Sequence, residues 1–469
     1  MFKRFTIQWW RFWRAGEGLS IKTGRALVLC ALTGLAAGFA AVGFYWLLDV
    51  AKHLLMTGCG HYAPPMAAGE VSVLRGHLPE TPVGEPLRWV LLFLPMAGAL
   101  ASALIVKLAP SAAGHGTDSV ILSYHRRFGY IAPKAVPVKA IASALIIGSG
   151  GSAGAEGPIT QIGAGCGSII TSLLNLTHSE RRLLMAAGMA AGVGALFRAP
   201  LAGAIFAAEV LYSGLDFEFE VLIPSMVAST IAYTVYALFY GWQPLFEMVH
   251  FGFDDGLKLF PYLVLALVVS LGAKLYILIF RKSESFFRNW KLPDWLKPAI
   301  GGLLTGILGF FLPQVMGAGY GLIQQTLVVD SALAERFGEL SIPILFAIFI
   351  GKIVATSFSV GSGGSGGLFG PALVAGSALG AFTGLVMTRL FPAMNLHPGS
   401  FAMVGMAGFL AASVRTPIAA IIMVSEITGN HGLLIPTMWV CGITYWIGNG
   451  WTIYRSQVRT RDCSPAHTR

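Results

Sequence analysis

GSGGSAGAEGP at residues 148–158 is spelled again as GSGGSGGLFGP at residues 361–371, with eight of eleven positions identical. Lys139 and Lys352 each stand nine residues before their copy, at the same offset of 213 residues. A second match follows in each half, because residues 188–209 resemble residues 405–426 at an offset of 217. Two ordered matches at nearly one offset indicate a duplicated unit, which makes the internal repeat the first feature of the fold.

The composition is that of a membrane protein. Of the 469 residues, 55% are hydrophobic and only 12% are charged, whereas a soluble chain is about 25% charged. Several apolar runs are long enough to cross about 30 Å of hydrocarbon: residues 26–50, 89–108, 222–240, 259–280, and 342–353 with its flanks. We therefore expect an all-α polytopic membrane protein rather than a signal peptide followed by a soluble domain.

The net charge of +10 is distributed around the apolar runs. Basic residues gather at the N-terminus, in the loop around residues 125–134, at residues 281–297 and in the C-terminal tail. The positive-inside rule then predicts a multi-pass protein of the inner (plasma) membrane with both termini in the cytoplasm. This pattern argues against nucleic acid as a partner. The five cysteines are scattered, so neither a disulfide framework nor a metal site is expected, and no cofactor is implied.

The chain divides into three expected parts. Residues 1–20 interleave tryptophans with arginines, which suits a cytoplasmic interfacial helix. Residues 21–455 form the transmembrane domain, with one repeat at about 25–240 and the other at about 255–450, and residues 456–469 form a cytoplasmic tail. The acidic stretch LDFEFE at residues 215–220 is expected to be a solvated turn.

The glycine-rich copies also satisfy two soluble-enzyme motifs. Residues 150–154 match the G-x-S-x-G nucleophile elbow around Ser152, and residues 361–366 match a dinucleotide fingerprint. Both matches lack the strand–turn–helix context that gives those motifs their chemistry. We expect no enzyme, and keep a membrane-embedded serine hydrolase as the alternative of another class.

Helix ends offer a better account of these copies. Each glycine-rich loop runs into an apolar helix near Pro158 or Pro371, and proline is well placed in a first helical turn. The first N–H groups of a helix lack internal partners, and that end carries roughly half a positive charge. Two such ends aimed at one point inside a membrane predict an anion site.

Glu156 lies at this position in the first copy. A carboxylate at membrane depth costs on the order of 3 kcal/mol and is functional by default. Its side chain can occupy the place of the anion and leave when it is protonated or displaced; an ordinary helix-capping carboxylate is the alternative. Phe369 takes the equivalent place in the second copy, so the two halves differ at the gate.

The motifs GAEGP, GLFGP and GHGTDS (residues 114–119) together resemble the CLC family of chloride channels and chloride/proton antiporters. The resemblance covers nearly the whole chain and implies the CLC fold, a homodimer in which two inverted-topology repeats of tilted and broken helices form one anion pathway per subunit. It further implies that Glu156 is the external gate. The residues that it assigns to anion binding are Ala155, Glu156, Gly157, Leu368, Phe369 and Tyr454. Without the resemblance, the sequence is equally consistent with Tyr454 as an aromatic anchor at the membrane interface.

This chain departs from the family pattern at two positions. His115 replaces the serine of the first motif; it can donate an N–H to an anion, or it can be a structural histidine turned away from the pathway. Val210 stands where antiporters commonly carry an internal proton-transfer glutamate. Lys139 is expected to be a pore-side positive charge, with snorkelling to the interface as the alternative.

We therefore predict chloride transport through a glutamate-gated pathway in a lipid bilayer. The valine at residue 210 favours a channel or a weakly coupled transporter. A chloride/proton antiporter, with protons as a second transported species, is the alternative.

Overall fold

The structure is a computed structural model that describes residues 19–72, 85–249, 251–329 and 340–467. Within these ranges the chain is helical, and its extended contacts are two isolated bridges, Gly154 with Gly367 and Tyr212 with Val458. The predicted all-α class is thus confirmed. The predicted interfacial helix at residues 1–20 falls outside the described residues, apart from the start of the first helix.

The helices of the first half, in chain order, are α2 (Leu19–Lys52), a π-helical extension η1 (His53–Cys59), α3 (Arg88–Val106), α4 (Gly116–Arg126), α5 (Ala135–Gly148), α6 (Glu156–Leu173), α7 (His178–Phe197), α8 (Pro200–Glu209) and α9 (Phe219–Tyr240).

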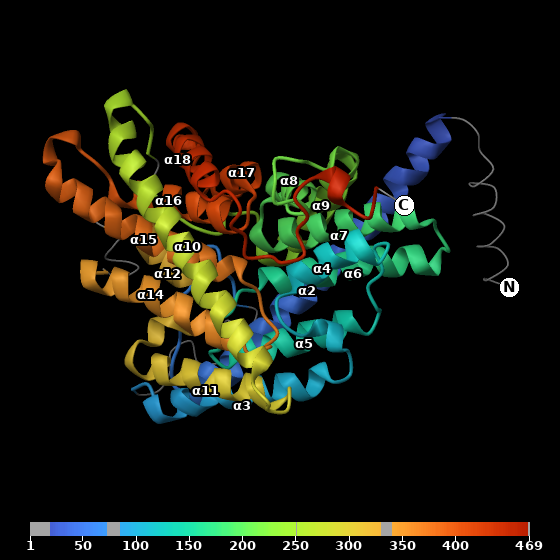
Figure 1. The fold of residues 1–469 in the computed structure, drawn as a ribbon, viewed down its shortest axis with the longest axis horizontal. Helices are drawn as coiled ribbons and strands as arrows, with labels where there is room; N and C mark the ends of the chain where they lie inside the picture. Colours follow the sequence, from blue (N-terminus) through green and yellow to red (C-terminus); the bar gives the residue numbers. More distant parts are fainter. Residues whose placement is uncertain (1–18, 73–84, 250, 330–339, 468–469) are drawn as a thin grey trace.

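Those of the second half are α10 (Leu259–Asn289), α11 (Leu296–Phe311), α12 (Tyr320–Leu327), α14 (Ile342–Ser359), α15 (Phe369–Leu390), α16 (Pro398–Ser413), α17 (Pro417–Thr428) and α18 (Leu434–Ile447). Helices α4–α9 lie to the right in Figure 1 and α10–α18 to the left, except that α11 packs beside α3 at the lower edge.

Six of the described helices are long and apolar enough to cross a membrane. Five of them coincide with the runs predicted from hydrophobicity, although α3 ends at Val106, two residues before the end of its run. The sixth, α15, was not predicted as a span because it starts within the second glycine-rich copy and is rich in glycine and alanine. Shorter apolar helices, such as α5 and α8, fill the space between the long ones, as expected for a fold that ends helices inside the membrane.

Glycines allow the closest helix pairs to approach, and they do so equivalently in the two halves. A Cβ added at Gly163 of α6 would meet the carbonyl of Gly188 on α7, and one added at Gly188 would meet the carbonyl of Gly163. Gly376 of α15 and Gly405 of α16 face each other in the same way. Small residues at such crossings let backbones pack tightly where lipid provides no hydrophobic drive. The duplicated sequence is therefore a duplicated packing unit.

Two carboxylates join the halves. Glu209, the last residue of α8, accepts hydrogen bonds from the Ile418 and Ala419 amides of α17, at 3.1 and 2.8 Å. Glu426 of α17 accepts bonds from the Leu201 and Ala202 amides of α8, at 3.3 and 2.8 Å. Each helix thus supplies the N-terminal cap of the other, since amides in a first helical turn have no partner within their own helix.

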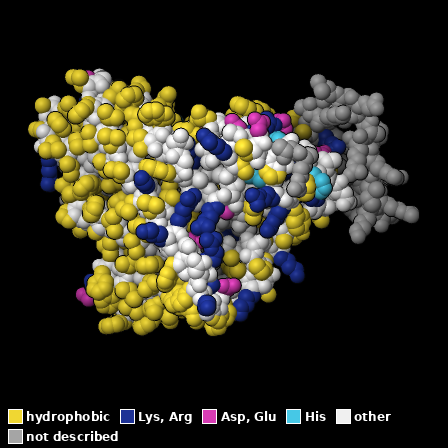
Figure 2. All heavy atoms as spheres, viewed as in Figure 1, with side chains coloured by type: hydrophobic (Ala, Val, Ile, Leu, Met, Phe, Trp, Pro, Cys, Tyr) yellow, Lys and Arg dark blue, Asp and Glu magenta, His cyan; other side chains and the backbone are white. Residues whose placement is uncertain are grey.

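The surface agrees with a membrane environment. Figure 2 shows hydrophobic side chains over most of the left and lower parts of the visible face, with lysines and arginines gathered near the centre. Large apolar side chains are widely exposed, among them Leu238, Phe239, Leu271, Phe311 and Trp446. Apolar exposure on this scale is tolerated in lipid and would cause aggregation in water.

Candidate functional site

The two glycine-rich copies lie directly against each other. The Gly154 amide donates to the Gly367 carbonyl at 2.9 Å, and the Gly367 amide donates to the Gly154 carbonyl at 2.7 Å. α6 begins two residues after the first of these glycines and α15 two residues after the second. The paired turns therefore bring two buried helix N-termini to one place, as the sequence predicts for an anion site.

The Glu156 carboxylate lies between these helix ends. Glu156 is the first residue of α6 and is 2% exposed. Its Oε1 accepts a hydrogen bond from the Tyr320 hydroxyl at 2.7 Å, and its Oε2 lies beside Gly154 and next to the first turn of α15 at Gly370. A negatively charged group tethered to α6 thus occupies the space that two helix dipoles make favourable for an anion.

The second copy has an aromatic side chain at the equivalent position. The ring of Phe369, which is buried, lies 5.6 Å by centroid from Phe197 and 5.6 Å from Phe206. The carbonyl of Leu368 accepts a hydrogen bond from the Tyr276 hydroxyl at 3.0 Å. The pair of helix ends is symmetric in backbone, while only one of them carries a carboxylate.

His115 and Tyr454 lie together at the next part of the site. Their rings are stacked with centroids 5.6 Å apart, and Phe280 meets the imidazole edge-on at 5.9 Å. Neither His115 Nδ1 nor the Tyr454 hydroxyl has a hydrogen-bond partner among the described residues, although both atoms are buried. Buried polar atoms without a protein partner call for another one; the Tyr454 hydroxyl, and Nδ1 in the tautomer that carries its proton there, can donate to an anion that the nearby helix ends attract.

Lys139 orders the loop that carries His115. Its ammonium group is buried and donates to the carbonyls of Ala112 at 3.1 Å and Gly114 at 2.6 Å, directly before the histidine. The charge is therefore held beside the site by backbone oxygens.

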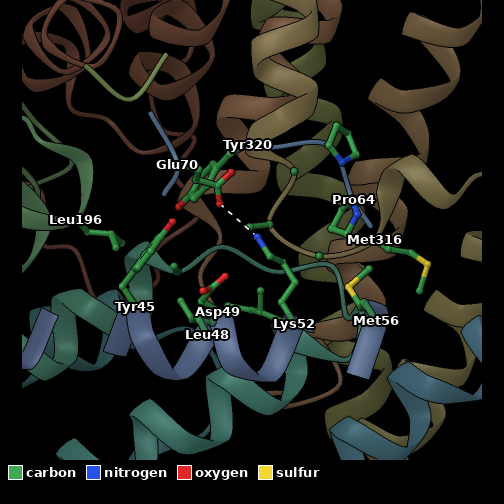
Figure 3. A pocket seen from close by; sticks show the side chains of 16 residues that line it. Tyr45, Leu48, Asp49, Lys52, Met56, Pro64, Glu70, Leu196, Met316 and Tyr320 are labelled. Carbon is green, nitrogen blue, oxygen red and sulfur yellow. Dashed lines mark ion pairs between the residues drawn. The ribbon is translucent and has the colours of Figure 1, made fainter. Parts of the chain in front are cut away.

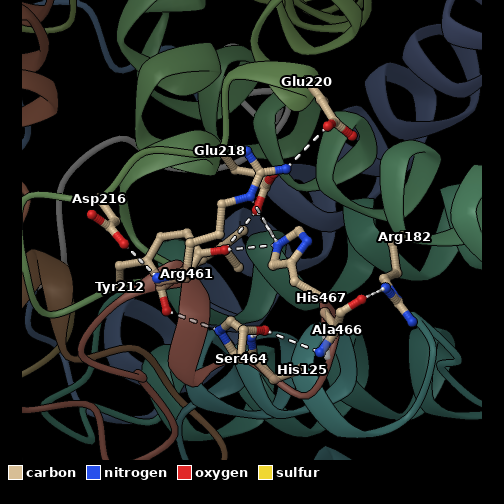
Figure 4. Close-up of polar contacts among 11 residues, drawn as sticks. His125, Arg182, Tyr212, Asp216, Glu218, Glu220, Arg461, Ser464, Ala466 and His467 are labelled. Carbon is tan, nitrogen blue, oxygen red and sulfur yellow. Dashed lines mark hydrogen bonds and ion pairs between the residues drawn. The ribbon is translucent and has the colours of Figure 1, made fainter. Parts of the chain in front are cut away.

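Val210 is fully buried at the end of α8, and the C-terminal tail covers it. Its carbonyl accepts a hydrogen bond from the Gln457 side chain at 2.9 Å. The nearby acidic turn was predicted to be solvated, which is wrong for Glu218: this carboxylate is 1% exposed and accepts a bond from the Tyr212 hydroxyl at 2.6 Å. Arg461 and His467 of the tail also contact Glu218, at 3.0 and 2.9 Å (Figure 4).

The sequence could not show that Glu218 is buried, because its charged partners Arg461 and His467 lie about 250 residues later in a tail without periodicity. Tyr320, the direct partner of Glu156, was also missed. The sequence did contain a signal for it, because a G-x-G motif precedes the lysine in both halves. In the first half this motif is Gly114-His115-Gly116, before Lys139. In the second half it is Gly317-Ala318-Gly319, before Lys352, and Tyr320 follows it directly.

A cavity adjoins the gate. Its lining includes Tyr320, Ala155 and Glu70, together with Asp49 and Lys52 of α2; Figure 3 shows Glu70 beside Tyr320 and the two α2 side chains facing them. Its volume of about 60 Å³ has room for about two water molecules. Lys52 pairs with Glu70 at 3.7 Å across it. Tyr320, whose hydroxyl bonds to the Glu156 carboxylate, is thus also a lining residue of this polar space.

Ser152 has the surroundings of a structural residue. It is fully buried, and its hydroxyl shares a hydrogen bond with the Thr356 hydroxyl at 3.0 Å. Its amide donates to the Ser359 hydroxyl at 3.0 Å. Neither contact supplies the general base that a serine nucleophile requires.

Comparison with known proteins shows which protein family this chain resembles. Residues 97–449 match the family model described as voltage gated chloride channel. A chloride channel protein of Ralstonia nicotianae described as ClcB-like is 31% identical over 365 residues, or 75% of this chain and 81% of that protein. The H⁺/Cl⁻ exchange transporter ClcA of Salmonella arizonae is 32% identical over 344 residues, or 72% of this chain and 71% of that one.

Two solved structures have a similar fold. A slow cyanobacterial Cl⁻/H⁺ antiporter matches with a TM-score of 0.75 and 22% identity, over 91% of this chain and 94% of that one. A CLC-type fluoride/proton antiporter matches with a TM-score of 0.76 and 23% identity, over 95% of this chain and all of that one. At these identities the likeness establishes the fold.

Proposed function

Because this chain belongs to the CLC family of anion-transporting membrane proteins, we propose that it exchanges chloride for protons across a membrane, with Glu156 as its gate. The observation that carries the proposal is the position of the Glu156 carboxylate between the N-termini of α6 and α15. A carboxylate that competes with a permeating anion for one site links anion movement to its own protonation.

The anion path follows the groups described above. In the outer part, the amides of Ala155, Glu156 and Gly157 at the start of α6 attract the anion when the carboxylate has left. In the central part, the amides of Leu368 and Phe369 act with the donors of His115 and Tyr454. Backbone amides and neutral donors bind a halide without a full positive charge at the contact, so the anion can also leave.

Protonation of Glu156 opens the path. An ionised carboxylate is attracted by the two helix ends and accepts strong hydrogen bonds, whereas a protonated carboxyl group has neither advantage. A proton that reaches the carboxylate therefore releases it from the site and lets an anion enter. The return of the ionised side chain expels the anion, which couples the two movements.

A channel or an uncoupled carrier is the second candidate, and residue 210 is the specific observation that favours it. Val210 offers no group that binds a proton, and the tail covers it. The exchange reading has the stronger support because the curated relative of Salmonella arizonae is named as an H⁺/Cl⁻ exchange transporter.

The test is purified protein in liposomes with a chloride gradient, with chloride and proton movements recorded together. Uphill proton movement driven by chloride supports exchange. Chloride flux without proton movement contradicts exchange and favours the channel. Absence of chloride flux in vesicles that hold folded protein contradicts both.

Replacing the gate gives the first specific prediction. We expect Glu156→Gln to abolish proton movement and the pH dependence of chloride flux, since the amide cannot ionise, while chloride flux persists and, at pH 7.5, is higher than in the wild type because the neutral side chain does not close the path. Chloride efflux from liposomes at pH 4.5, 6.0 and 7.5 measures this. A variant that still moves protons and still responds to pH would refute the role of Glu156.

We also propose the assembly and orientation. The distribution of basic residues favours a protein of the inner membrane with cytoplasmic termini, and the cavity beside Tyr320 then faces outward. Family membership favours a homodimer in the bilayer. Chemical crosslinking in native membranes, followed by mass measurement of the detergent-solubilised protein, distinguishes one chain from two.

A further inference from the structure

The structure contains two equivalent loops, each held by a buried lysine. Lys139 of α5 donates to the carbonyls of Ala112 and Gly114. Lys352 of α14 donates to the carbonyls of Val315 at 3.2 Å and Gly317 at 2.7 Å, in the same relative positions. Gly114 and Gly317 also share a φ of 64°, a left-handed conformation that favours glycine. The two lysines thus fix two copies of one backbone shape.

Each loop delivers a side chain to the pathway. The first loop ends at His115, which lies beside Tyr454. The second loop leads through Gly319, with φ at 88°, into Tyr320 as the first residue of α12. The Tyr320 side chain is buried, and its hydroxyl donates to Glu156 Oε1 at 2.7 Å. The ring packs edge-on against Phe246, with centroids 6.4 Å apart. The position of the phenol is therefore fixed by backbone and packing, independently of the carboxylate that it contacts.

Tyr320 also forms part of the wall between the gate and the polar cavity. Tyr320 lines this space beside Glu70, and Lys52 of α2 faces them (Figure 3). A carboxylate that swings away from the helix ends toward this cavity must first break its bond with the phenol.

We propose that Tyr320 is the positioning residue of the Glu156 gate: its hydroxyl holds the ionised carboxylate between the two helix ends and releases it on protonation. The inference rests on the proposed function of Glu156. A phenol donates strongly to a carboxylate and only weakly to a protonated carboxyl group, so the bond stabilises the closed, ionised state selectively. Its strength then sets the pH at which the gate opens.

The other ionisable groups around Glu156 act differently. Lys352 faces it from α14, Tyr276 from α10, and Tyr454 from the segment before the tail. The Lys352 ammonium is engaged with loop carbonyls, and the Tyr276 hydroxyl donates to Leu368. Among these groups, Tyr320 is the one whose hydrogen bond ends on the carboxylate.

The experiment compares Tyr320→Phe with the wild type in liposomes, with chloride efflux measured from pH 4.5 to 7.5. Loss of the hydroxyl keeps the ring and removes one bond to a charged acceptor. We expect efflux at pH 7.5 to rise about tenfold and the midpoint of the pH profile to move up by about one unit. Tyr262→Phe is the matched control, because this buried tyrosine donates to or accepts from Ser400 at 2.8 Å, away from the gate.

The same substitution in a Glu156→Gln background separates positioning from a general structural role. If Tyr320 acts through the carboxylate, Tyr320→Phe changes nothing further there. A loss of flux that is equal in both backgrounds, or an unchanged pH profile in the wild-type background, overturns the inference. If Glu156→Gln itself behaves like the wild type, the proposed gate fails instead, and the two failures are thus distinguished.

A second variant tests the sign of the effect. Incorporation of 3,5-difluorotyrosine at position 320 keeps the shape and makes the phenol a stronger donor. The midpoint of the pH profile is then expected to move down, opposite to the shift for Tyr320→Phe. A shift in the same direction for both variants contradicts a role through the hydrogen bond.

Discussion

At the scale of single residues, the site contains buried polar atoms that have no hydrogen-bond partner among the described residues. His115 Nδ1 and the Tyr454 hydroxyl are buried and lack a hydrogen-bond partner in the described part of the chain. Leaving a buried donor unpaired costs about 1–3 kcal/mol, so two adjacent cases are unexpected in a purely structural core. An anion that accepts from both relieves this cost each time it occupies the site.

His115 gives the prediction at this scale. His115→Ser keeps a hydrogen-bond donor but removes the imidazole, which can take up a proton where a hydroxyl cannot. We expect chloride flux at pH 7.5 to stay within about fivefold of the wild type, while the change in flux or in chloride-over-bromide preference between pH 7.5 and 5.5 becomes smaller. Anion-substitution flux assays at both pH values measure this. Identical pH responses and preferences in the two proteins would mean that His115 lies off the pathway.

Residue types predicted part of the site, and long-range contacts determined the rest. Glu156 was identifiable because a carboxylate beside a glycine-rich turn is exceptional in an apolar sequence. Its contact with Tyr320 was not identifiable, because the two residues are 164 positions apart and a tyrosine in an apolar helix has many ordinary uses. The burial of Glu218 was missed for the same reason.

At the scale of elements, helix ends are the functional parts. The turns at Gly154 and Gly367 pair with each other, so that α6 and α15 start side by side inside the protein. Hydrophobicity predicted the long spans α2, α3, α9, α10 and α14, because their apolar runs are continuous. Hydrophobicity did not identify α15 as a membrane span, because its many glycines and alanines lower its mean hydropathy. Neighbouring helices, rather than lipid, cover most of it.

The exchange of caps between α8 and α17 leads to a prediction about stability. Glu209→Ala leaves the Ile418 and Ala419 amides without their acceptor in a buried place, which should cost about 1.5–3 kcal/mol and lower the thermal unfolding temperature in detergent by several degrees. Glu209→Gln should retain much of the stability because one oxygen remains.

Glu284→Ala is the matched control. Its carboxylate pairs with Arg455 at 2.7 Å, and both side chains are partly exposed, so its removal should change stability little. If Glu209→Ala unfolds at the same temperature as Glu284→Ala, the caps do not contribute to stability.

At the scale of the whole molecule, the tail joins parts of the chain that are far apart in sequence. Ser456 bonds to Asp118 of α4, and Ser464 lies 2.7 Å from His125 Nδ1 (Figure 4). Arg182 donates to the Ala466 carbonyl at 2.5 Å. The tail therefore binds to α4 and α7 through polar contacts, and its Gln457 also bonds to the carbonyl of Val210 at the end of α8.

His125 makes this docking sensitive to pH. It lies in the last turn of α4, outside the six helices long enough to cross a membrane, and burial lowers its pKa despite the hydrogen bond to Leu211. A lowered pKa in the docked state means that docking is fully favourable above the ordinary value of about 6.5 and weakens as pH falls below it. Neighbouring His467, Glu218 and Arg126 modulate the same group.

We therefore expect the tail to loosen between pH 7.5 and 5.5. A spin label on Cys463, which is exposed, reports its mobility in a Cys59→Ser background. Mobility should rise at low pH in the wild type and become less dependent on pH in His125→Gln. Equal pH responses in the two proteins would assign the effect to another group.

The mutual capping of α8 and α17 also bears on how the protein is made. The amides at the start of α8 receive their acceptors from a residue 224 and 225 positions later. During synthesis, the first half therefore enters the membrane with an incomplete helix end and stays unfinished until the ribosome has translated nearly the whole second half. Each half thus lacks, within its own sequence, the acceptor for one buried helix end and receives it only when the two halves come together.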